Sequence, residues 1–373
     1  MRLVEPRLLD VPGFRGFLDQ LSVEYDVIGP VVRDGAVVYD SVTTVDDLPR
    51  GIHDEQGTGR YRLSQGDDEA WFGYVVGPHS WKRFLHPPVL TLWRAERRDR
   101  GFEITAPAEP TRPHAFLGVR ACELAAIAVL DRVLLGGAYI DPSYRARREA
   151  ALLVAVNCGR AGANCFCASM QTGPRARTGF DLVLTEILEG EHRILVEVGS
   201  ERGLALIEAS SARPATPRDQ DEAENALAAV PPQMGKRLET DGLQELLYRH
   251  YESPQWDQVA KRCLACANCT MVCPTCFCMS VEDATDLAGK EATRTRRSDS
   301  CFTTEFSYIH GGSVRTSTGA RYRQWITHKL ATWQDQYGSS GCVGCGRCIT
   351  WCPVGIDLTE EVRALREGDA RRR

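Results

Sequence analysis

The sequence predicts an α+β protein in which an N-terminal α/β region precedes a mainly α-helical, cysteine-rich region. The first observation is a change in the hydrophobic pattern along the chain. In the N-terminal part, short apolar runs typical of strands alternate with apolar residues three or four positions apart, which is typical of helices, whereas the C-terminal part shows the helical pattern alone. The second is that 15 cysteines occur in 373 residues, eight of them in two closely spaced runs. We expect an α+β segment at 1–115, an α/β domain at 116–210, a linker at 211–240 and the helical region at 241–373.

Composition places the chain among ordinary globular proteins. Its 43% hydrophobic and 25% charged residues are typical of such proteins, and 373 residues suffice for two or three domains. A formal net charge of −5 disfavours nucleic acid as the main partner. The first thirty residues lack the apolar core of a signal peptide, and no apolar run approaches the ~20 residues that span a bilayer. We therefore expect a cytoplasmic protein whose many cysteines are reduced or metal-bound.

Apolar runs and helical spacing locate most of the regular elements. No glycine-rich dinucleotide motif and no phosphate-loop lysine motif occurs, so nucleotide binding has no support in the sequence. The predicted strands are 31–38, 70–76, 116–119, 151–156, 181–188 and 192–198, and the predicted helices are 122–135, 202–209, 319–336 and 358–367.

The two cysteine runs share the spacing C-x2-C-x2-C-x3-C-P, which is typical of bacterial two-cluster ferredoxins. In that pattern the fourth cysteine of each run ligates the other cluster. We therefore expect one [4Fe–4S] cluster, cluster I, on Cys263, Cys266, Cys269 and Cys352, and a second, cluster II, on Cys342, Cys345, Cys348 and Cys273. The alternative is structural zinc, which uses two cysteines per half-site where each run here has four.

Four more cysteines lie at predicted strand ends and turns of the α/β domain. These are Cys122, Cys158, Cys165 and Cys167. Loops beyond the carboxyl ends of parallel strands are where α/β sheets place ligands, and four thiols are what one further [4Fe–4S] cluster requires. Their spacing matches no known motif, however, and free cysteine is among the most buried residue types. A third cluster and ordinary buried thiols therefore both remain open.

The remaining cysteines are Cys276, Cys278 and Cys301. Packing beside cluster II is one interpretation of them, and a further metal or redox-active thiol site is the other. The insert between the two runs also carries positive charge, at Arg315, Arg321, Arg323, His328 and Lys329. Cationic groups close to an anionic cluster raise its reduction potential, although a solvated helix face explains the same residues equally well.

Five segments together resemble one protein family. They are Gly118-Val-Arg-Ala-Cys122-Glu, Asn157-Cys158 with Cys165-Phe-Cys167, Cys273-Pro-Thr-Cys276-Phe-Cys278, Asp299-Ser-Cys301, and the stretch 342–357. The chain resembles the iron–sulfur β subunit of cytoplasmic NAD(P)-linked [NiFe] hydrogenases (sulfhydrogenases), a family shared with the electron-transfer subunit of anaerobic sulfite reductase. The family pattern around Cys122 is R-P-C-D, whereas this chain has Arg120-Ala-Cys122-Glu123, which affects only the local turn.

The resemblance implies an electron-transfer subunit. Its partners would be the small and large hydrogenase subunits with a flavin- and NAD(P)-binding γ subunit, or the subunits of a sulfite reductase. No side chain is expected to act as an acid, base or nucleophile, because an electron relay needs none. Two other hypotheses stay open: a reductase acting on sulfur or sulfite through its own thiols, and an interaction module whose clusters are only structural.

Overall fold

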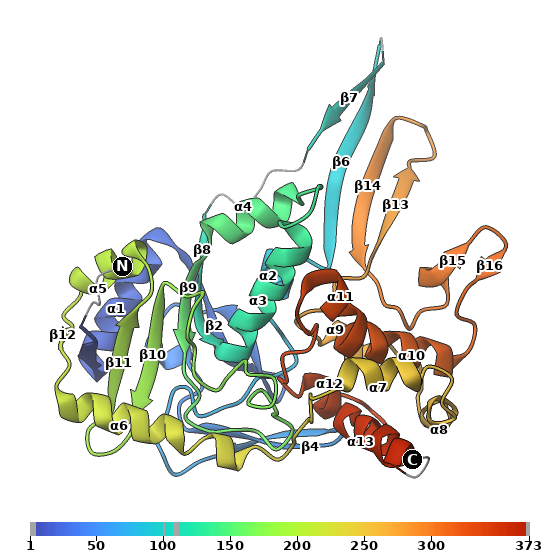
Figure 1. Ribbon diagram of the computed structural model, residues 1–373. Coiled ribbons are helices and arrows are strands. Elements are labelled where there is room, and N and C mark those ends of the chain that lie inside the picture. Colours follow the sequence, from blue (N-terminus) through green and yellow to red (C-terminus); the bar gives the residue numbers. More distant parts are fainter. Residues whose placement is uncertain (1–4, 100, 107–111, 371–373) are drawn as a thin grey trace.

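The computed structural model describes residues 5–99, 101–106 and 112–370, and its largest element is an eight-stranded sheet (Figure 1). Four adjacent strands are parallel, with three strands on one side of them and one on the other, and all other neighbouring strands pair antiparallel. In spatial order the strands are β12 (Arg213–Pro214), β1 (Arg7–Asp10), β11 (Arg193–Val198), β10 (Leu182–Ile187), β9 (Leu152–Val156), β8 (His114–Arg120), β2 (Asp26–Arg33) and β3 (Ala36–Ser41).

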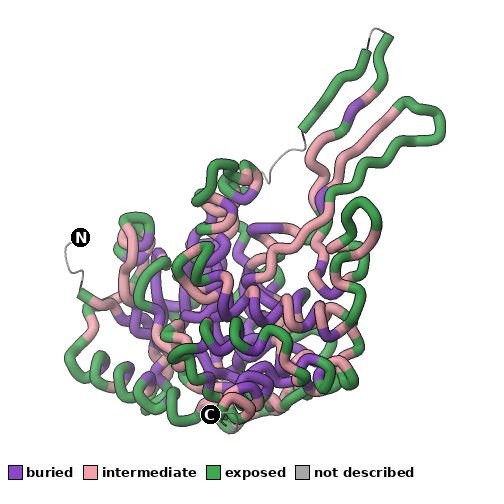
Figure 2. The backbone as a smooth tube through the Cα atoms, turned by 45° about the vertical axis from the view of Figure 1, so that its right-hand side comes forward, coloured by how far each residue is buried: buried purple, intermediate pink, exposed green. Residues whose placement is uncertain are grey.

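Helices cover both faces of this sheet, as the continuous apolar strand β9 requires. Leu152, Val154 and Val156 of β9 join one core, whereas Leu153 and Ala155 join another. The first core is covered by α1 (Val11–Glu24) and α5 (Glu201–Glu208), and the second by α2 (Lys82–Leu85), α3 (Ala121–Leu134) and α4 (Pro142–Ala150). The residues of both cores are buried and lie in the interior of the body (Figure 2), so the sheet is a rigid base for the loops at its strand ends.

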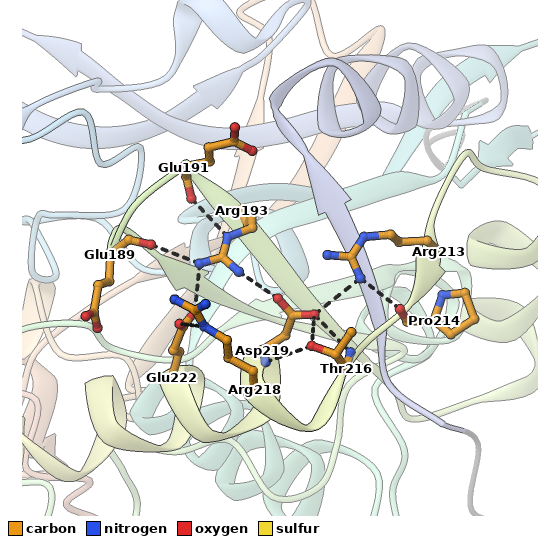
Figure 3. A network of polar contacts seen from close by, with 9 residues as sticks. All are labelled: Glu189, Glu191, Arg193, Arg213, Pro214, Thr216, Arg218, Asp219 and Glu222. Atoms are coloured by element: carbon orange, nitrogen blue, oxygen red, sulfur yellow. Dashed lines mark hydrogen bonds and ion pairs between the residues drawn. The ribbon is translucent and has the colours of Figure 1, made fainter.

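The sheet crosses the segment boundaries expected from the sequence. It takes β1, β2 and β3 from residues 1–115, and residue 116 lies inside β8. The expected linker contributes β12 and the helix α6 (Pro217–Ala228). Ion pairs hold α6 to the sheet: Arg193 of β11 binds Asp219 at 2.6 Å and Glu222 at 2.7 Å (Figure 3). One sheet therefore takes strands from all three of these expected segments. The sequence did not indicate this, because strand pairing between distant segments leaves no local mark in it.

Two strand predictions in residues 1–115 are wrong in detail. The apolar run 31–38 is a hairpin, because Asp34 and Gly35 adopt positive φ angles of 48° and 73° and turn the chain from β2 into β3. The run 70–76 forms no strand. Side chains satisfy its buried backbone instead: Glu186 accepts from the N–H groups of Trp71 and Phe72.

The cysteine runs lie in a separate helical layer with its own core of aromatic and aliphatic side chains. The helix predicted at 319–336 is confirmed as α10, a π-helical turn and α11, and the helix predicted at 358–367 is confirmed as α13. The helices of this layer are α7 (Leu243–Arg249), α8 (Gln255–Ala260), α9 (Asn268–Met271), α10 (Thr318–Thr327), the π-turn His328–Thr332, α11 (Trp333–Tyr337), α12 (Arg347–Thr350) and α13 (Leu358–Ala370). Within the described ranges, no helix is both long and apolar enough to cross a membrane.

The insert between the runs also forms strands, which the expectation of a mainly helical region did not include. The strands β13 (Met279–Thr285) and β14 (Glu291–Ser298) pair with β6 (Val89–Arg98) and β7 (Gly101–Thr105) in a second sheet, in the order β13-β14-β6-β7. This sheet projects from the body and is largely exposed (Figures 1 and 2). Its strands are rich in charged residues and bury little, so helical periodicity gave no warning of them. The remaining short strands are β4 (Ile52–Gly57), β5 (Arg60–Gln65), β15 (Tyr308–Ile309) and β16 (Gly312–Ser313).

Candidate metal centres

The first site is an apolar cavity bounded by cysteines from both runs. Cys263 and Cys266 lie on the loop from α8 to α9, Cys269 lies in α9, and Cys352 follows α12. All four line the cavity together with Cys348 and the aromatic rings of Phe302, Tyr322 and Trp325. The thiols that spacing assigns to cluster I are thus brought together, although Cys269 and Cys352 are 83 positions apart in the sequence.

Backbone amides point at the sulfurs of this site. The N–H of Ala265 donates to Cys263 Sγ at 3.4 Å, and that of Ile356 donates to Cys352 Sγ at 3.2 Å. Such hydrogen bonds favour the thiolate over the thiol and stabilise negative charge on sulfur. Asn268 ties the two halves together, because its side-chain amide donates to the carbonyl of Trp351.

The second site lies deeper in the molecule. Cys273, Cys342 and Cys345 are buried, whereas Cys266 of the first site is exposed. Burial raises the pKa of Cys342 to about 12, so this thiol keeps its proton unless a cationic partner replaces it. Lys329 supplies one fixed positive group, with Nζ 3.2 Å from Cys273 Sγ and 3.0 Å from Thr275 Oγ1. Burial acts to lower the pKa of Lys329, but attraction to Cys273 and its neighbours outweighs burial and raises it.

Both cysteine loops have the same backbone shape but different residues. The residues before and after the second cysteine have positive φ in each run: 51° and 64° at Ala265 and Ala267, and 65° and 76° at Gly344 and Gly346. A Cβ on Gly344 would lie 2.7 Å from the backbone of Cys167, and one on Gly346 would lie 2.4 Å from the carbonyl oxygen of Asn164. Glycine is required in the second loop because the α/β domain packs directly against it, whereas the first loop tolerates alanine.

The third group of thiols is gathered at the carboxyl ends of β8 and β9. Cys122 lies in the first turn of α3, Cys158 follows β9, and Cys165 and Cys167 lie on the next loop. All four line one small apolar cavity, and Cys345 of the second run completes its wall. Burial raises the pKa of Cys165 to about 12, as expected for a thiol shielded from water.

Thiols that surround a cavity fit a cluster better than a single ion. A tetrahedral zinc with Zn–S bonds of about 2.3 Å needs sulfurs within about 4 Å of one another. Among the described residues, no group of three or more His, Cys, Asp or Glu side chains is placed to hold one metal ion. The cysteine-only donor sets, the apolar walls and the N–H···S bonds are the features that iron–sulfur clusters use.

Comparison with known proteins agrees with this geometry. A family model described as a 4Fe-4S dicluster domain matches residues 262–356, the stretch that contains both runs. Over 361 residues the chain is 34% identical to sulfhydrogenase 2 subunit beta of Pyrococcus furiosus, which covers 95% of this chain and 96% of that protein. The chain belongs to the sulfhydrogenase β-subunit family. The family resemblance predicted from the cysteine segments is confirmed, and with it an iron–sulfur, electron-transfer subunit with a 4Fe-4S dicluster domain.

One buried ion pair in this β-subunit fold was not foreseen from the sequence. Arg347, between Cys345 and Cys348, donates to Glu123 Oε1 at 2.5 Å, and both side chains are fully buried. Tyr39 and Trp81 donate to the other oxygen of Glu123 at 2.7 and 3.0 Å. Glu123 also accepts from the backbone N–H of Arg120, so glutamate caps α3 in the turn where the family pattern has aspartate. The pair fixes the second cysteine run against the strand end that carries Cys122.

The three remaining cysteines divide into two contacts. Cys276 lies against Cys273, with their thiols hydrogen-bonded, and Lys82 donates to the carbonyl oxygens of both residues at 2.9 Å. Cys278 and Cys301 form a separate hydrogen-bonded thiol pair at the base of the β13–β14 hairpin. Two other cations of the insert have protein partners: Arg321 binds the carbonyl of Phe302, and Arg323 pairs with Glu252.

Proposed function

We propose that this chain relays electrons through [4Fe–4S] clusters between a [NiFe] hydrogenase module and a flavin- and NAD(P)-binding subunit. The observation that carries the proposal is the position of the second site between the other two. Cys348 of the second site lines the cavity of the first, and Cys345 lines the cavity of the third. Adjacent sites linked in this way make a continuous path from the exposed Cys266 into the α/β domain.

The proposed ligands follow the exchanged pattern. Cluster I would be held by Cys263, Cys266, Cys269 and Cys352, and cluster II by Cys342, Cys345, Cys348 and Cys273. Each cluster, when bound, takes up and returns a single electron. The chain's own residues keep water from the first site with Phe302, Tyr322 and Trp325, donate backbone N–H groups to the sulfurs, and place the Lys329 ammonium beside Cys273. None of these tasks requires an acid, a base or a nucleophile.

We extend the relay to a third [4Fe–4S] cluster on Cys122, Cys158, Cys165 and Cys167. Four thiols on one cavity supply the complete ligand set, and the shared wall at Cys345 brings that cavity next to the second site. The Cys158→Ala variant tests this part. We expect it to lose about one third of the iron and acid-labile sulfide of the wild-type chain. An unchanged iron content would mean that these four are ordinary buried thiols.

The hydrogenase context is supported by the family relative, whose name is that of a sulfhydrogenase subunit. The test is reconstitution. The purified chain is mixed with a flavin-binding partner and a [NiFe] hydrogenase module, and hydrogen-dependent reduction of NADP⁺ is followed. We expect turnover only with the cluster-loaded chain, and none with a Cys263→Ser/Cys342→Ser double variant.

Two results would contradict this proposal. Sulfite-dependent oxidation of reduced cofactor with a sulfite-reducing partner, and no hydrogen-dependent activity, would place the chain in a sulfite reductase. Reduction of sulfur or sulfite by the isolated chain with a reduced viologen dye would make it a reductase in its own right.

A further inference from the structure

The thiol pair Cys278–Cys301 lies outside the proposed electron path and has no assigned role. Cys278 directly precedes β13 and Cys301 lies just beyond β14, so strand pairing brings them together. The register pairs Met279 with Ser298, and the N–H of Asp299 donates to the carbonyl of Cys278 at 2.9 Å. Their thiols are hydrogen-bonded to each other, and the backbone N–H of Cys301 also donates to Cys278.

Cys301 is held in a tightly bonded turn. The carboxylate of Asp299 accepts from the N–H of Ser300 at 2.7 Å and from the hydroxyl of Thr303 at 2.8 Å. The Ser300 hydroxyl in turn contacts that of Thr270 at 2.7 Å. The positions of both sulfurs are thus fixed by the backbone, and both cysteines are partly exposed to solvent.

We propose that Cys278 and Cys301 form a redox-active dithiol that exchanges an electron pair with small disulfide-containing molecules. The contact between the sulfurs is the arrangement that closure of a disulfide requires. Partial exposure gives a small molecule access to both. The other thiol contact, Cys273–Cys276, is not available for this chemistry because Cys273 is a proposed cluster ligand.

The two cysteines have different parts in the reaction. Cys278 first loses its proton to water, and its thiolate then attacks one sulfur of the small disulfide, forms a mixed disulfide and releases one thiolate. Cys301 then loses its proton to that thiolate, attacks the sulfur of Cys278 and releases the second thiolate, which takes a proton from water. The net reaction converts one dithiol and one small disulfide into one protein disulfide and two small thiols. Cys278 is the better first nucleophile, because the hydrogen bond from Cys301 lowers the pKa of Cys278 to about 7.

Return to the dithiol takes two electrons and two protons. Cys269 of the first site is close enough to Cys301 to interact with it electrostatically, so the first site is the proposed electron donor, and this return step alone rests on the proposed function. The exchange with a small disulfide depends only on the two thiols. An experiment can therefore disprove the electron relay without disproving the dithiol reaction, and the reverse.

The test uses anaerobically purified, cluster-loaded full chain and bis(2-hydroxyethyl) disulfide. After incubation, free thiols are alkylated and the peptides are identified by mass spectrometry. We expect a disulfide between Cys278 and Cys301, release of two molecules of 2-mercaptoethanol per chain, and unchanged iron content and EPR spectrum. In Cys301→Ser we expect Cys278 to retain one mercaptoethanol as a mixed disulfide. In Cys278→Ser we expect at least a tenfold slower reaction, whereas Cys276→Ser should react like the wild type.

Two outcomes would overturn the proposal. One is that Cys278 and Cys301 stay unlinked in the wild type, at a disulfide concentration that oxidises a control dithiol. The other is loss of iron in Cys278→Ser or Cys301→Ser, which would identify the pair as cluster ligands.

Discussion

The ammonium group of Lys329 lies 3.2 Å from the sulfur of Cys273, inside a fully buried part of the second site. Among the residues that the structure describes, no carboxylate shares this position: the other acceptors of Lys329 are Thr275 Oγ1 and the carbonyl of Gly341. A buried cation needs a negative partner, and the sulfur of a cluster ligand provides one. Lys329 is thus a buried positive charge in direct contact with a proposed cluster ligand.

Lys329→Met should make cluster II harder to reduce. Reduction adds negative charge, which a cation 3.2 Å from a ligand sulfur stabilises. We expect at least a tenfold shift of the reduction equilibrium, which corresponds to about 59 mV towards negative potential for one electron. EPR-monitored redox titration measures it, with Lys329→Arg as the control that keeps the charge. An unchanged potential in Lys329→Met, with iron content intact, would mean that the lysine is only structural.

The exchange of ligands between the runs predicts which cluster each variant loses. Cys352→Ser should remove cluster I although it changes the second run, and Cys273→Ser should remove cluster II although it changes the first. Cys263→Ser and Cys342→Ser, which change one ligand of cluster I and one ligand of cluster II, identify the cluster that is lost. Cys352→Ser should leave the same reduced EPR spectrum as Cys263→Ser, and Cys273→Ser the same spectrum as Cys342→Ser. A match of Cys352→Ser with Cys342→Ser, and of Cys273→Ser with Cys263→Ser, would show that each run holds its own cluster.

Glu123→Gln should destabilise the protein by about 3–5 kcal/mol. The substitution keeps the shape of the side chain but leaves the fully buried Arg347 without a counter-charge. Urea unfolding followed by circular dichroism gives the change in the free energy of unfolding. The matched control is Asp46→Asn, which removes an exposed ion pair with Arg15 and should change stability little. Equal effects of the two substitutions would contradict a structural role for the buried pair.

His86 should make the fold sensitive to mildly acidic pH. Burial, followed by the nearby positive charge of Arg296, lowers the pKa of His86 to about 4. The unfolded chain binds a proton near pH 6.5 and the folded chain only near pH 4, so the stabilisation is present above pH 6.5 and is lost as pH falls from 6.5 to 4. The loss is at most about 3 kcal/mol.

Thermal unfolding of wild type and His86→Gln at pH 7 and pH 5 tests this dependence. The midpoint should fall less between the two pH values in the variant. His310→Gln, at an exposed position, should behave like the wild type. If the midpoint of unfolding fell by the same amount in His86→Gln and in the wild type, the pH dependence would belong to other groups.

Local patterns in the sequence correctly predicted the dicluster domain and most of the helices and strands. The C-x2-C-x2-C-x3-C-P spacing is a property of one loop, and the alternation of strand and helix after residue 116 appears in β8, α3 and β9. The positions of Cys122 and Cys158 at strand ends followed from the same pattern. The features that could be predicted are therefore those that depend on interactions between residues close together in the sequence.

Long-range relationships could not be read in this way. The addition of β1 to the sheet, the pairing of β14 with β6 and the ion pair between Glu123 and Arg347 join residues 183 to 224 positions apart. The sequence shows glycine at 344 and 346 but not why glycine is required there. The reason is that the backbone of residues 164–167 packs directly against both positions. In the sequence, Lys329 is one of several cations in the insert. The structure distinguishes it, because Lys329 contacts the sulfur of Cys273, whereas Arg321 binds a backbone carbonyl and Arg323 binds a glutamate.

The most direct test of the relay is the content of iron and acid-labile sulfide per chain in anaerobically purified protein, with EPR of the dithionite-reduced sample. We predict about twelve irons, four for each of three clusters, and a spectrum of magnetically interacting [4Fe–4S] centres. About eight irons would restrict the relay to the two clusters of the exchanged runs. Zinc in place of iron, or iron that dithionite cannot reduce, would contradict the account.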